Sequence, residues 1–259
     1  MTEQAVEATI HSQGEVWFAS REVGRLADTE SYILNTALYY ALGFSSGRYL
    51  DTAFEPTYVE DTERVASEVY VSPAAPIGRV DDVPDRTNYI TSTYNTSDDS
   101  YATLNLSAQE DPDAKKNLPS YGRRRVLGHD NLFRFFLIPK DGDAEAIREQ
   151  MPQYIRLGKK RGKARIDARV VPAERRSGTY RLGHPIGAYD SEQTPKGNLI
   201  TKRMRPTPLV IEGEYEGHHV AIRTDSMPTP DQDGNENGGD DSPKYVRLPG
   251  DVTFLKTKR

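Results

Sequence analysis

The strongest periodic pattern in the chain is one amphipathic stripe, and it limits how much helix the fold contains. Apolar side chains recur three and four residues apart at Ile33, Leu34, Ala37, Leu38, Ala41 and Leu42. This spacing predicts a helix that is capped by Asp28 or Thr29 and ends at Gly43. The other apolar runs are short and β-prone, so the sequence predicts a fold made mostly of strands.

The short runs predict a series of strands. Glu15 to Ala19 predicts an opening strand, Leu132 to Pro139 a buried strand, and Ala164 to Val171 a strand with alternate residues facing outward. After Phe44, prolines at 56, 73, 76 and 84 favour hairpins and long loops over helices. The other expected elements are a strand at Glu68–Val71, a short helix at Ala144–Gln150, a strand pair at Leu209–Glu214 and Gly217–Arg223, and a final strand or two in Tyr245–Leu255.

This order of elements predicts an α+β fold of the ferredoxin-like kind, with a mostly antiparallel sheet. The chain has 259 residues, of which 36% are hydrophobic, so we expect a single domain over residues 1–259. Two polar, largely acidic stretches, Tyr94 to Asn117 and Ser226 to Ser242, predict surface loop insertions. The second has too little apolar content to fold by itself.

Composition excludes several kinds of protein. The absence of cysteine rules out disulfides and thiolate metal sites. No run approaches the roughly 18 apolar residues of a membrane span, and Met1 to Ser12 lacks the basic start and apolar run of a signal peptide. We therefore expect a cytoplasmic protein without a membrane partner. The chain also lacks a P-loop and a Gly-x-Ser-x-Gly elbow.

The net charge of −5 hides a strong asymmetry along the chain. Met1 to Lys115 has 7 basic and 20 acidic residues, a net charge of −13. Lys116 to Val210 has 21 basic and 9 acidic residues, a net charge of +12, and Ile211 to Arg259 has 6 and 10, a net charge of −4. Concentrated positive charge in an acidic protein is typical of a surface that attracts a polyanion. The alternative is random clustering on a solvated, salt-tolerant surface.

The densest basic cluster lies between Tyr154 and Arg169. It comprises Arg156, Lys159, Lys160, Arg161, Lys163, Arg165 and Arg169, opposed only by Asp167. Gly158 and Gly162 bracket the densest run, so we expect backbone N–H groups to form an anion-binding concavity there. The basic side chains would neutralise phosphates, and Tyr154 offers a face on which a base stacks. The alternative is an exposed hairpin whose charge only maintains solubility.

Three further basic runs support this interpretation. They are Arg123, Arg124 and Arg125 beside Tyr121, then Arg175 and Arg176 before Tyr180 and Arg181, and Lys202 to Arg205 ahead of Pro206. Each run by itself is as compatible with a solvated turn as with a ligand contact. Arg203 and Arg205 are the stronger candidates, because Pro206 and Pro208 favour an extended arm that could follow a single nucleic-acid strand.

Two segments resemble a known family. VWFASREVGRLADTESYILNTALYYALG, from Val16 to Gly43, and MPQYIRLGKKRGKARID, from Met151 to Asp167, are similar to the type I-D CRISPR-associated Cas-five group, also called the Csc-one family. The similarity covers Glu15 to Gly43, then more loosely Asn131 to Asp167 and Leu199 to Leu255, about half of the chain. The acidic insertions depart from the family pattern.

The resemblance implies a repeat-associated RNA-binding fold and a non-catalytic subunit of a Cascade ribonucleoprotein complex in antiviral defence. Such a subunit holds the 5′ handle of the crRNA, caps the Cas-seven-type backbone and contacts the Cas-ten-like large subunit, without a cofactor or metal. Target DNA near the flanking motif is a further candidate partner. The resemblance places the segment Arg156 to Arg165 on the handle, with Trp17, Arg21 and Arg25 near the same RNA. Trp17 is otherwise a core residue.

Two other functions stay open from the sequence. Relatives in other CRISPR subtypes cut precursor RNA without metal, using His, Tyr or Lys, so a metal-independent endoribonuclease is the alternative. The candidate histidines are His11, His129, His184, His218 and His219, none of them inside the basic segment. His129 and Asp130 form the only adjacent His–carboxylate pair, which is a weak signal. The third candidate is a structural or ribosome-associated RNA scaffold.

Overall fold

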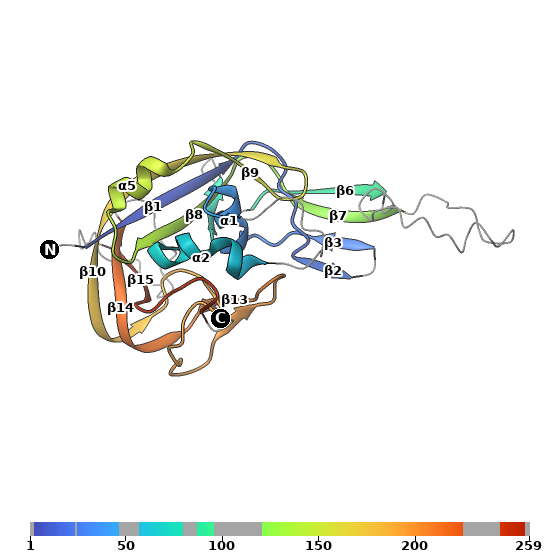
Figure 1. Ribbon diagram of the computed structural model, residues 1–259. Helices are drawn as coiled ribbons and strands as arrows, with labels where there is room; N and C mark the ends of the chain where they lie inside the picture. Colours follow the sequence, from blue (N-terminus) through green and yellow to red (C-terminus); the bar gives the residue numbers. More distant parts are fainter. Residues whose placement is uncertain are drawn as a thin grey trace, which may run out of the picture.

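A large antiparallel sheet forms the centre of the protein (Figure 1). The computed structural model describes residues 3–23, 25–46, 57–79, 87–95, 121–224 and 244–256. The sheet runs in the order β15 (Lys244–Pro249), β14 (Glu214–Thr224), β10 (Gly162–Arg181), β1 (Glu3–Ser12), β8 (Asn131–Pro139) and β4 (Val69–Val71), with β5 (Ala75–Arg79) also paired to β8 and β9 (Tyr154–Leu157) to β10. Every described pairing in this sheet is antiparallel.

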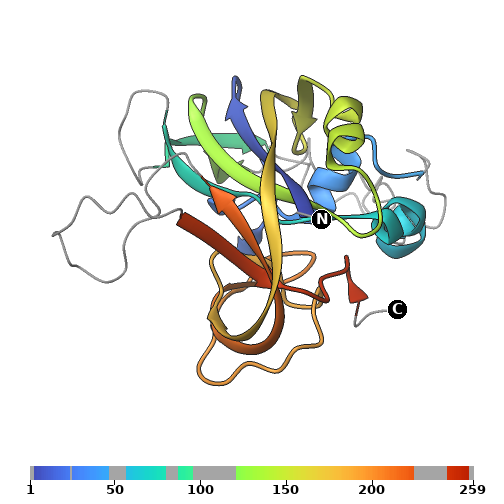
Figure 2. The same cartoon turned by 90° about the vertical axis from the view of Figure 1, so that its left-hand side faces the viewer.

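In the described part of the chain, three short helices cover one face of this sheet: α1 (Asn35–Ala41), α2 (Tyr58–Glu68) and α5 (Ala144–Gln150). Val6, Ala8 and Ile10 of β1 point to this face, because alternate residues of a strand share a side, and all three are fully buried. Leu38 of α1 and Ala144 of α5 pack in the same core cluster. The view along the sheet in Figure 2 shows these helices on one side and the β14–β15 hairpin on another.

A second sheet projects from the body as an arm (Figure 1). It consists of β2 (Arg21–Val23), β3 (Leu26–Asp28), β7 (Tyr121–Leu127) and β6 (Tyr89–Asn95), in that order. Its β3–β7 pairing is parallel, whereas the other pairings among the described strands are antiparallel. A third, small sheet has the order β11 (Ile186–Gly187), β13 (Leu209–Glu212) and β12 (Ile200–Lys202).

One buried carboxylate joins parts of the chain that lie far apart in sequence. Asp190 is fully buried and accepts hydrogen bonds from Asn35 Nδ2 at 2.8 Å, Tyr70 Oη at 2.9 Å and the backbone N–H groups of Gly187 at 2.9 Å and Leu255 at 3.1 Å. Burial raises the pKa of Asp190, and its four donors oppose that effect. These bonds fix α1 and β4 against the C-terminal segment.

The expected opening strand at Glu15 to Ala19 is wrong. The first strand is β1, and the expected run makes only an isolated bridge between Val16 and Leu127. The signal of β1 is weak in sequence because the small Ala8 stands between Val6 and Ile10 on its inward face. The aromatic run instead crosses from the central sheet to the arm.

The helix with the apolar stripe is confirmed, but its start is wrong. Asp28 lies in β3, and the Thr29 hydroxyl donates to the carbonyl of Phe18 at 2.8 Å, so neither residue caps α1. Gly43 follows the helix with φ 78°, a left-handed conformation that favours glycine, as expected. The helix α2 contradicts the expectation of hairpins and loops after Phe44. The prolines that suggested loops lie outside it, and its own sequence contains no residue that breaks a helix.

Most other strands are confirmed, as is the α+β architecture with a mostly antiparallel sheet. α5 has the predicted bounds, and β8 and β4 differ from the predicted strands by one residue each. The predicted pairing of the strands near Leu209 and Gly217 is wrong: β13 pairs with β11 and β12, while β14 pairs with β10 and β15. Apart from the end of β6, the two predicted insertions lie outside the described residues.

The buried histidine His184 generates a prediction about acid stability. Its Nε2 donates to the carbonyl of Pro73 at 2.7 Å, and burial together with the charge of Arg134 lowers its pKa to about 3. Below about pH 6.5, His184 takes up a proton in the unfolded chain but stays neutral in the native protein. The free energy of unfolding therefore falls by about 1.4 kcal/mol per pH unit as the pH decreases. We expect about 2 kcal/mol of this loss between pH 7 and pH 5, measured by urea unfolding.

His184→Gln keeps a donor for Pro73 without an imidazole to titrate. It should therefore show a smaller loss of stability between pH 7 and pH 5 than the wild type. The control is His218→Gln at an exposed position, which should keep the full loss. An unchanged loss in His184→Gln would contradict the assignment.

Candidate nucleic-acid interface

The predicted basic segment is a hairpin at one edge of the central sheet. β9 pairs with the start of β10, so that Leu157 faces Gly162 and Tyr154 faces Arg165. Ile155 and Leu157 turn into the core, and alternation therefore turns Tyr154 and Arg156 outward. The buried side chains anchor the hairpin and the charged ones stay exposed.

The hairpin packs directly against the backbone of Glu15 to Trp17. A Cβ on Gly158 would lie 2.4 Å from the Trp17 carbonyl oxygen, and one on Gly162 would lie 2.1 Å from the Glu15 carbonyl oxygen. Gly158 also has φ 72°, and the N–H of Lys159 donates to the Trp17 carbonyl at 2.8 Å. Both glycines are therefore required for close backbone approach.

The expected concavity of free N–H groups is wrong for two of its members. The N–H of Lys159 is bound to Trp17, and the N–H of Arg161 donates to the carbonyl of Gly158 at 3.0 Å. These amides are satisfied within the protein, so they are not available to an anion. The hairpin offers a ligand its side chains instead.

Trp17 is a core residue that organises the cations around it. Its side chain is 1% exposed, so a base has no face of Trp17 on which to stack. The Nζ atoms of Lys159 and Lys160 lie 5.0 and 5.8 Å from the ring centroid, and the guanidinium carbon of Arg124 lies 5.0 Å from it. Cation–π attraction therefore holds the hairpin cations and Arg124 of the arm around one ring.

A groove of about 600 Å³ opens beside the hairpin. Its described lining includes four cations and no carboxylate. The cations are Arg156, Lys159, Arg161 and Arg205, and the other lining residues are Phe18, Ser20, Tyr32, Leu34, Thr36, Ala37, Tyr40, Ala41, Tyr58, Leu157, Gly158, Met204 and Pro206. The groove thus combines an aromatic and aliphatic floor with a positive rim, the combination that suits single-stranded nucleic acid.

Tyr154 stands at a second hollow, of about 410 Å³. Its side chain is 49% exposed, and Lys163 Nζ lies 4.2 Å from the centroid of its ring. Arg165 lines the same hollow but is held by Asp167, with Nη2 to Oδ2 at 2.6 Å. The ring of Tyr154 is accessible, as the stacking interpretation requires.

Acidic residues of β2, β3 and the next turn lie among the cations. Glu22 lies 3.9 Å from both Lys159 Nζ and Arg205 Nη1. Asp28 binds Arg125, with Oδ1 to Nε at 2.6 Å, and this bond raises the pKa of Arg125. The remaining pairs are Arg21 with Asp28 at 3.4 Å and Lys202 with Glu30 at 2.9 Å. Part of the positive charge is therefore neutralised internally.

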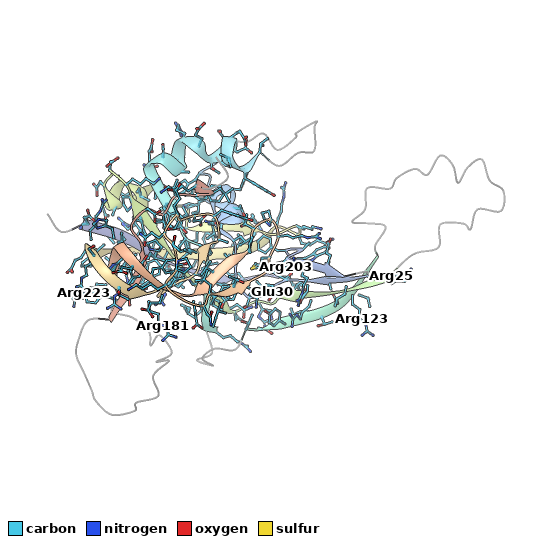
Figure 3. The ribbon with its side chains drawn as sticks, turned by 90° about the horizontal axis from the view of Figure 1, so that it is seen from below. Arg25, Glu30, Arg123, Arg181, Arg203 and Arg223 are labelled. Carbon is cyan, nitrogen blue, oxygen red and sulfur yellow. The ribbon has the colours of Figure 1, made fainter. Side chains whose placement is uncertain are left out.

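Seven of the predicted cations have no carboxylate partner in the described part of the chain: Arg25, Arg123, Arg124, Arg156, Lys160, Lys163 and Arg203. Figure 3 shows Arg25 and Arg123 near the end of the arm, with Arg203 and Glu30 nearer its base. The N–H of Arg123 donates to the carbonyl of Arg25 at 2.9 Å, which keeps these two together. These side chains are available to an anionic ligand.

The structure brings the β9–β10 hairpin and the segment Met204–Pro206 together at the groove. Arg124 lies close to the same place, because its guanidinium approaches the Trp17 ring. It places Arg21, Arg25 and Arg123 on the projecting arm. Sequence reasoning missed the aromatic floor, formed by Phe18, Tyr32, Tyr40 and Tyr58. The available signal was Tyr32 and Tyr40, which lie next to apolar residues of the predicted helical stripe. Tyr58 belongs to the unpredicted helix α2.

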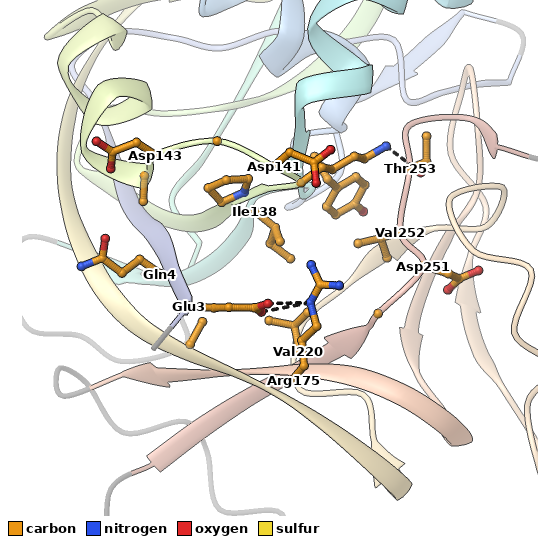
Figure 4. A pocket seen from close by; sticks show the side chains of 17 residues that line it. Glu3, Gln4, Ile138, Asp141, Asp143, Arg175, Val220, Asp251, Val252 and Thr253 are labelled. Carbon is orange, nitrogen blue, oxygen red and sulfur yellow. Dashed lines mark hydrogen bonds and ion pairs between the residues drawn. The ribbon is translucent and has the colours of Figure 1, made fainter. Parts of the chain in front are cut away.

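A cavity of about 450 Å³ lies away from the hairpin (Figure 4). Glu3 and Arg175 form an ion pair across it, with Oε1 to Nε at 2.8 Å. Its lining has four carboxylates and two cations, Lys140 and Arg175. This charge balance disfavours a polyanion, so the groove beside the hairpin is the better candidate site.

The histidines fall into different environments. His11 Nε2 and His129 Nδ1 lie 3.3 and 2.6 Å from the two oxygens of Asp130, and these hydrogen bonds lower the pKa of Asp130. His184 is buried in the core, and His219 stacks on Tyr180 at 4.3 Å between ring centroids. In the described residues, no group of three His or carboxylate side chains is placed to hold a metal ion. None of the described helices has the length and hydropathy to cross a membrane.

The fold and groove define a strand-rich α+β protein with a surface suited to a polyanionic chain. The model of the family described as type I-D CRISPR-associated protein Cas5/Csc1 matches residues 3–256, and the chain therefore belongs to this family. A search among curated proteins gave no match.

A comparison with solved structures found CRISPR proteins at low sequence identity. A chain of the type III-B Cmr-beta complex bound to cognate target RNA has 10% identity and a TM-score of 0.44, covering 81% of this chain and 86% of that one. The same complex with AMPPnP gives 10% and 0.42, covering 82% and 85%. A CRISPR protein from Archaeoglobus fulgidus gives 10% and 0.40, covering 86% and 96%.

The close approach of Gly158 to Trp17 makes a testable prediction. Gly158→Ala places a methyl group against backbone in a left-handed conformation, so we expect a loss of about 2 kcal/mol or more in unfolding free energy, measured by urea unfolding. Gly142→Ala is the matched control, because a Cβ there has no neighbour within 4 Å, and it should cost less than about 0.5 kcal/mol. Equal stability of the two variants would contradict the packing account.

Proposed function

We propose that the chain is the non-catalytic crRNA-binding subunit of a type I-D CRISPR Cascade effector complex. In this role it holds the crRNA 5′ handle, caps the Cas-seven-type backbone and contacts the Cas-ten-like large subunit. The observation that carries the proposal is the groove rimmed by four cations, with no carboxylate in its described lining. Membership in the Cas5/Csc1 family supports it.

The topology of the central sheet supports a ferredoxin-like origin for the fold. β10, β1, β8 and β4 lie side by side in that order, with α1 and α2 between β1 and β4 in the chain and α5 between β8 and β10. Numbered by chain order within this set, the strands read 4-1-3-2, the antiparallel order of a β-α-β-β-α-β unit. On this view, β14, β15 and the arm are additions to an RNA-recognition module.

The groove's chemistry favours holding RNA by its backbone. Lys and Arg side chains neutralise phosphates whatever the base sequence, and aromatic side chains accept any base. This suits a subunit whose complex reads target sequence through guide pairing, while protein contacts read backbone shape and a short flanking motif. Target DNA near that motif is a further proposed contact of the arm, where Arg25 and Arg123 are unpaired in the described structure.

The endoribonuclease alternative has one observation in its favour. His11 and His129 share Asp130, and His11 faces Arg165 in the β1–β10 register, so two imidazoles lie near the basic hairpin. A pair of histidines could supply an acid and a base. We propose that they do not do so here, because Asp130 binds both rings and a shared carboxylate competes with an RNA phosphate for them.

Purification of the full chain with its neighbouring subunits tests the function. We expect co-purified RNA of uniform length, and we expect no cleavage of repeat RNA by the isolated chain, with or without divalent metal. Heterogeneous RNA would favour a scaffold. Specific cleavage that is lost in His129→Ala would establish the endoribonuclease instead.

The contribution of the hairpin is measured by the salt dependence of RNA binding. Replacing Lys159, Lys160 and Arg161 with Ala should flatten the log–log salt slope by about 2, since each phosphate contact on a single strand contributes about 0.7. The control removes three cations that are each paired to a carboxylate, Arg176, Arg181 and Lys196, and should leave the slope unchanged. If both triple variants keep the wild-type slope, the hairpin is only a solvated surface.

A further inference from the structure

The groove beside the hairpin has three kinds of wall. The β9–β10 hairpin forms one side, and Met204 to Pro206 form another. The floor includes α1, where Ala37 and Ala41 leave open space that larger side chains would fill. A volume of about 600 Å³ falls within the range of pockets that enclose small organic ligands.

One polar group of the lining has no hydrogen-bond partner among the described residues. Thr36 is 4% exposed and lines the groove, and its hydroxyl makes no hydrogen bond within the described residues. Its backbone N–H is already satisfied by Asn35 Oδ1 at 3.1 Å. A hydroxyl that lines a groove without a hydrogen-bond partner in the protein can donate to or accept from a ligand that enters the groove.

Four aromatic rings line the same groove. Phe18, Tyr32 and Tyr58 are partly buried in the lining, and Tyr40 is 38% exposed. The Tyr40 hydroxyl donates to Asp61 Oδ2 at 2.5 Å, which fixes this ring, and its centroid lies 6.2 Å from that of Tyr58 in an edge-on arrangement. Rings held in this way present an apolar site for another planar group.

We propose that this groove binds one unpaired nucleobase of the RNA, whose flanking phosphates lie on the rim cations. The inference rests on the proposed function and deepens it, because it adds a base-recognition site to backbone binding. Stacking against the aromatic lining supplies affinity, and the Thr36 hydroxyl supplies a hydrogen bond to the base edge. Arg156, Lys159, Arg161 and Arg205 neutralise the adjoining phosphates.

The alternative occupant is an apolar segment of a partner protein. The charge of the lining argues against it, because four cations without a carboxylate would be costly to desolvate beneath a neutral side chain. A nucleotide brings apolar faces, polar edges and negative charge at once. It therefore satisfies the floor, the Thr36 hydroxyl and the rim together.

Binding of the full chain to single-stranded RNA of about ten nucleotides tests the inference, with an abasic ribose-phosphate strand of equal length as the comparison probe. The wild type should bind the base-bearing strand about 5- to 150-fold more tightly. Ala37→Phe fills the groove and should lose most of that preference while keeping the salt slope. Thr36→Val removes the hydroxyl at nearly constant volume and should reduce affinity for the base-bearing strand alone.

Ala146→Phe is the control, because it makes the same change at an exposed position of α5. It should leave the preference intact, and the thermal midpoint of each variant reports on folding. Equal binding of both strands by the wild type would overturn the inference while leaving phosphate-based RNA binding standing. The inference would also be overturned if folded Ala37→Phe and Thr36→Val kept the full preference for the base-bearing strand. It would be overturned as well if these variants lost only the binding of protein partners. Failure to bind either strand would instead count against the proposed function.

Discussion

The architecture of the candidate site depends on backbone contact between Gly158 and Trp17. Without side chains at Gly158 and Gly162, the hairpin reaches the segment Glu15 to Trp17 closely enough for the N–H of Lys159 to bond the Trp17 carbonyl. That contact brings Lys159 and Lys160 over the buried indole, which Arg124 of the arm also approaches. One ring thus joins the sheet edge, the arm and the groove rim.

The charge asymmetry of the sequence becomes a local balance in the fold. The acidic first third of the chain supplies Glu22, Asp28 and Glu30, and these lie among cations supplied by the middle third. Glu22 approaches a cation on each side of the groove, Lys159 and Arg205. An RNA phosphate must compete with these carboxylates, which lowers affinity for stray polyanions and favours a ligand that engages the whole groove.

Sequence reasoning succeeded where one strong local signal determines the outcome. α5 carries Asp143 as an N-cap that accepts from the Glu145 N–H, and β8 is apolar throughout except for Asn131 and Arg134, so both were predicted closely. The basic hairpin was located for the same reason. β1 and α2 were missed because their stability comes from burial of small or isolated apolar residues such as Ala8 and Ala66, a tertiary effect.

The candidate site was predicted in its charges but not in its shape. Basic runs are visible in sequence, whereas a groove floor built from α1, α2 and Phe18 exists only after long-range packing. The glycines of the hairpin were recognised as important for a different reason: they permit packing on Trp17 rather than exposing N–H groups. A local motif thus located the site and tertiary contacts determined how it works.

Photo-cross-linking tests the central claim most directly. RNA that carries 4-thiouridine would be irradiated in the assembled complex, and the cross-linked peptides of this chain identified by mass spectrometry. We expect cross-links in the β9–β10 hairpin, in the segment Met204–Pro206 and at the aromatic floor of the groove. Cross-links confined to the β14–β15 hairpin or to the cavity around Glu3 and Arg175 would contradict it.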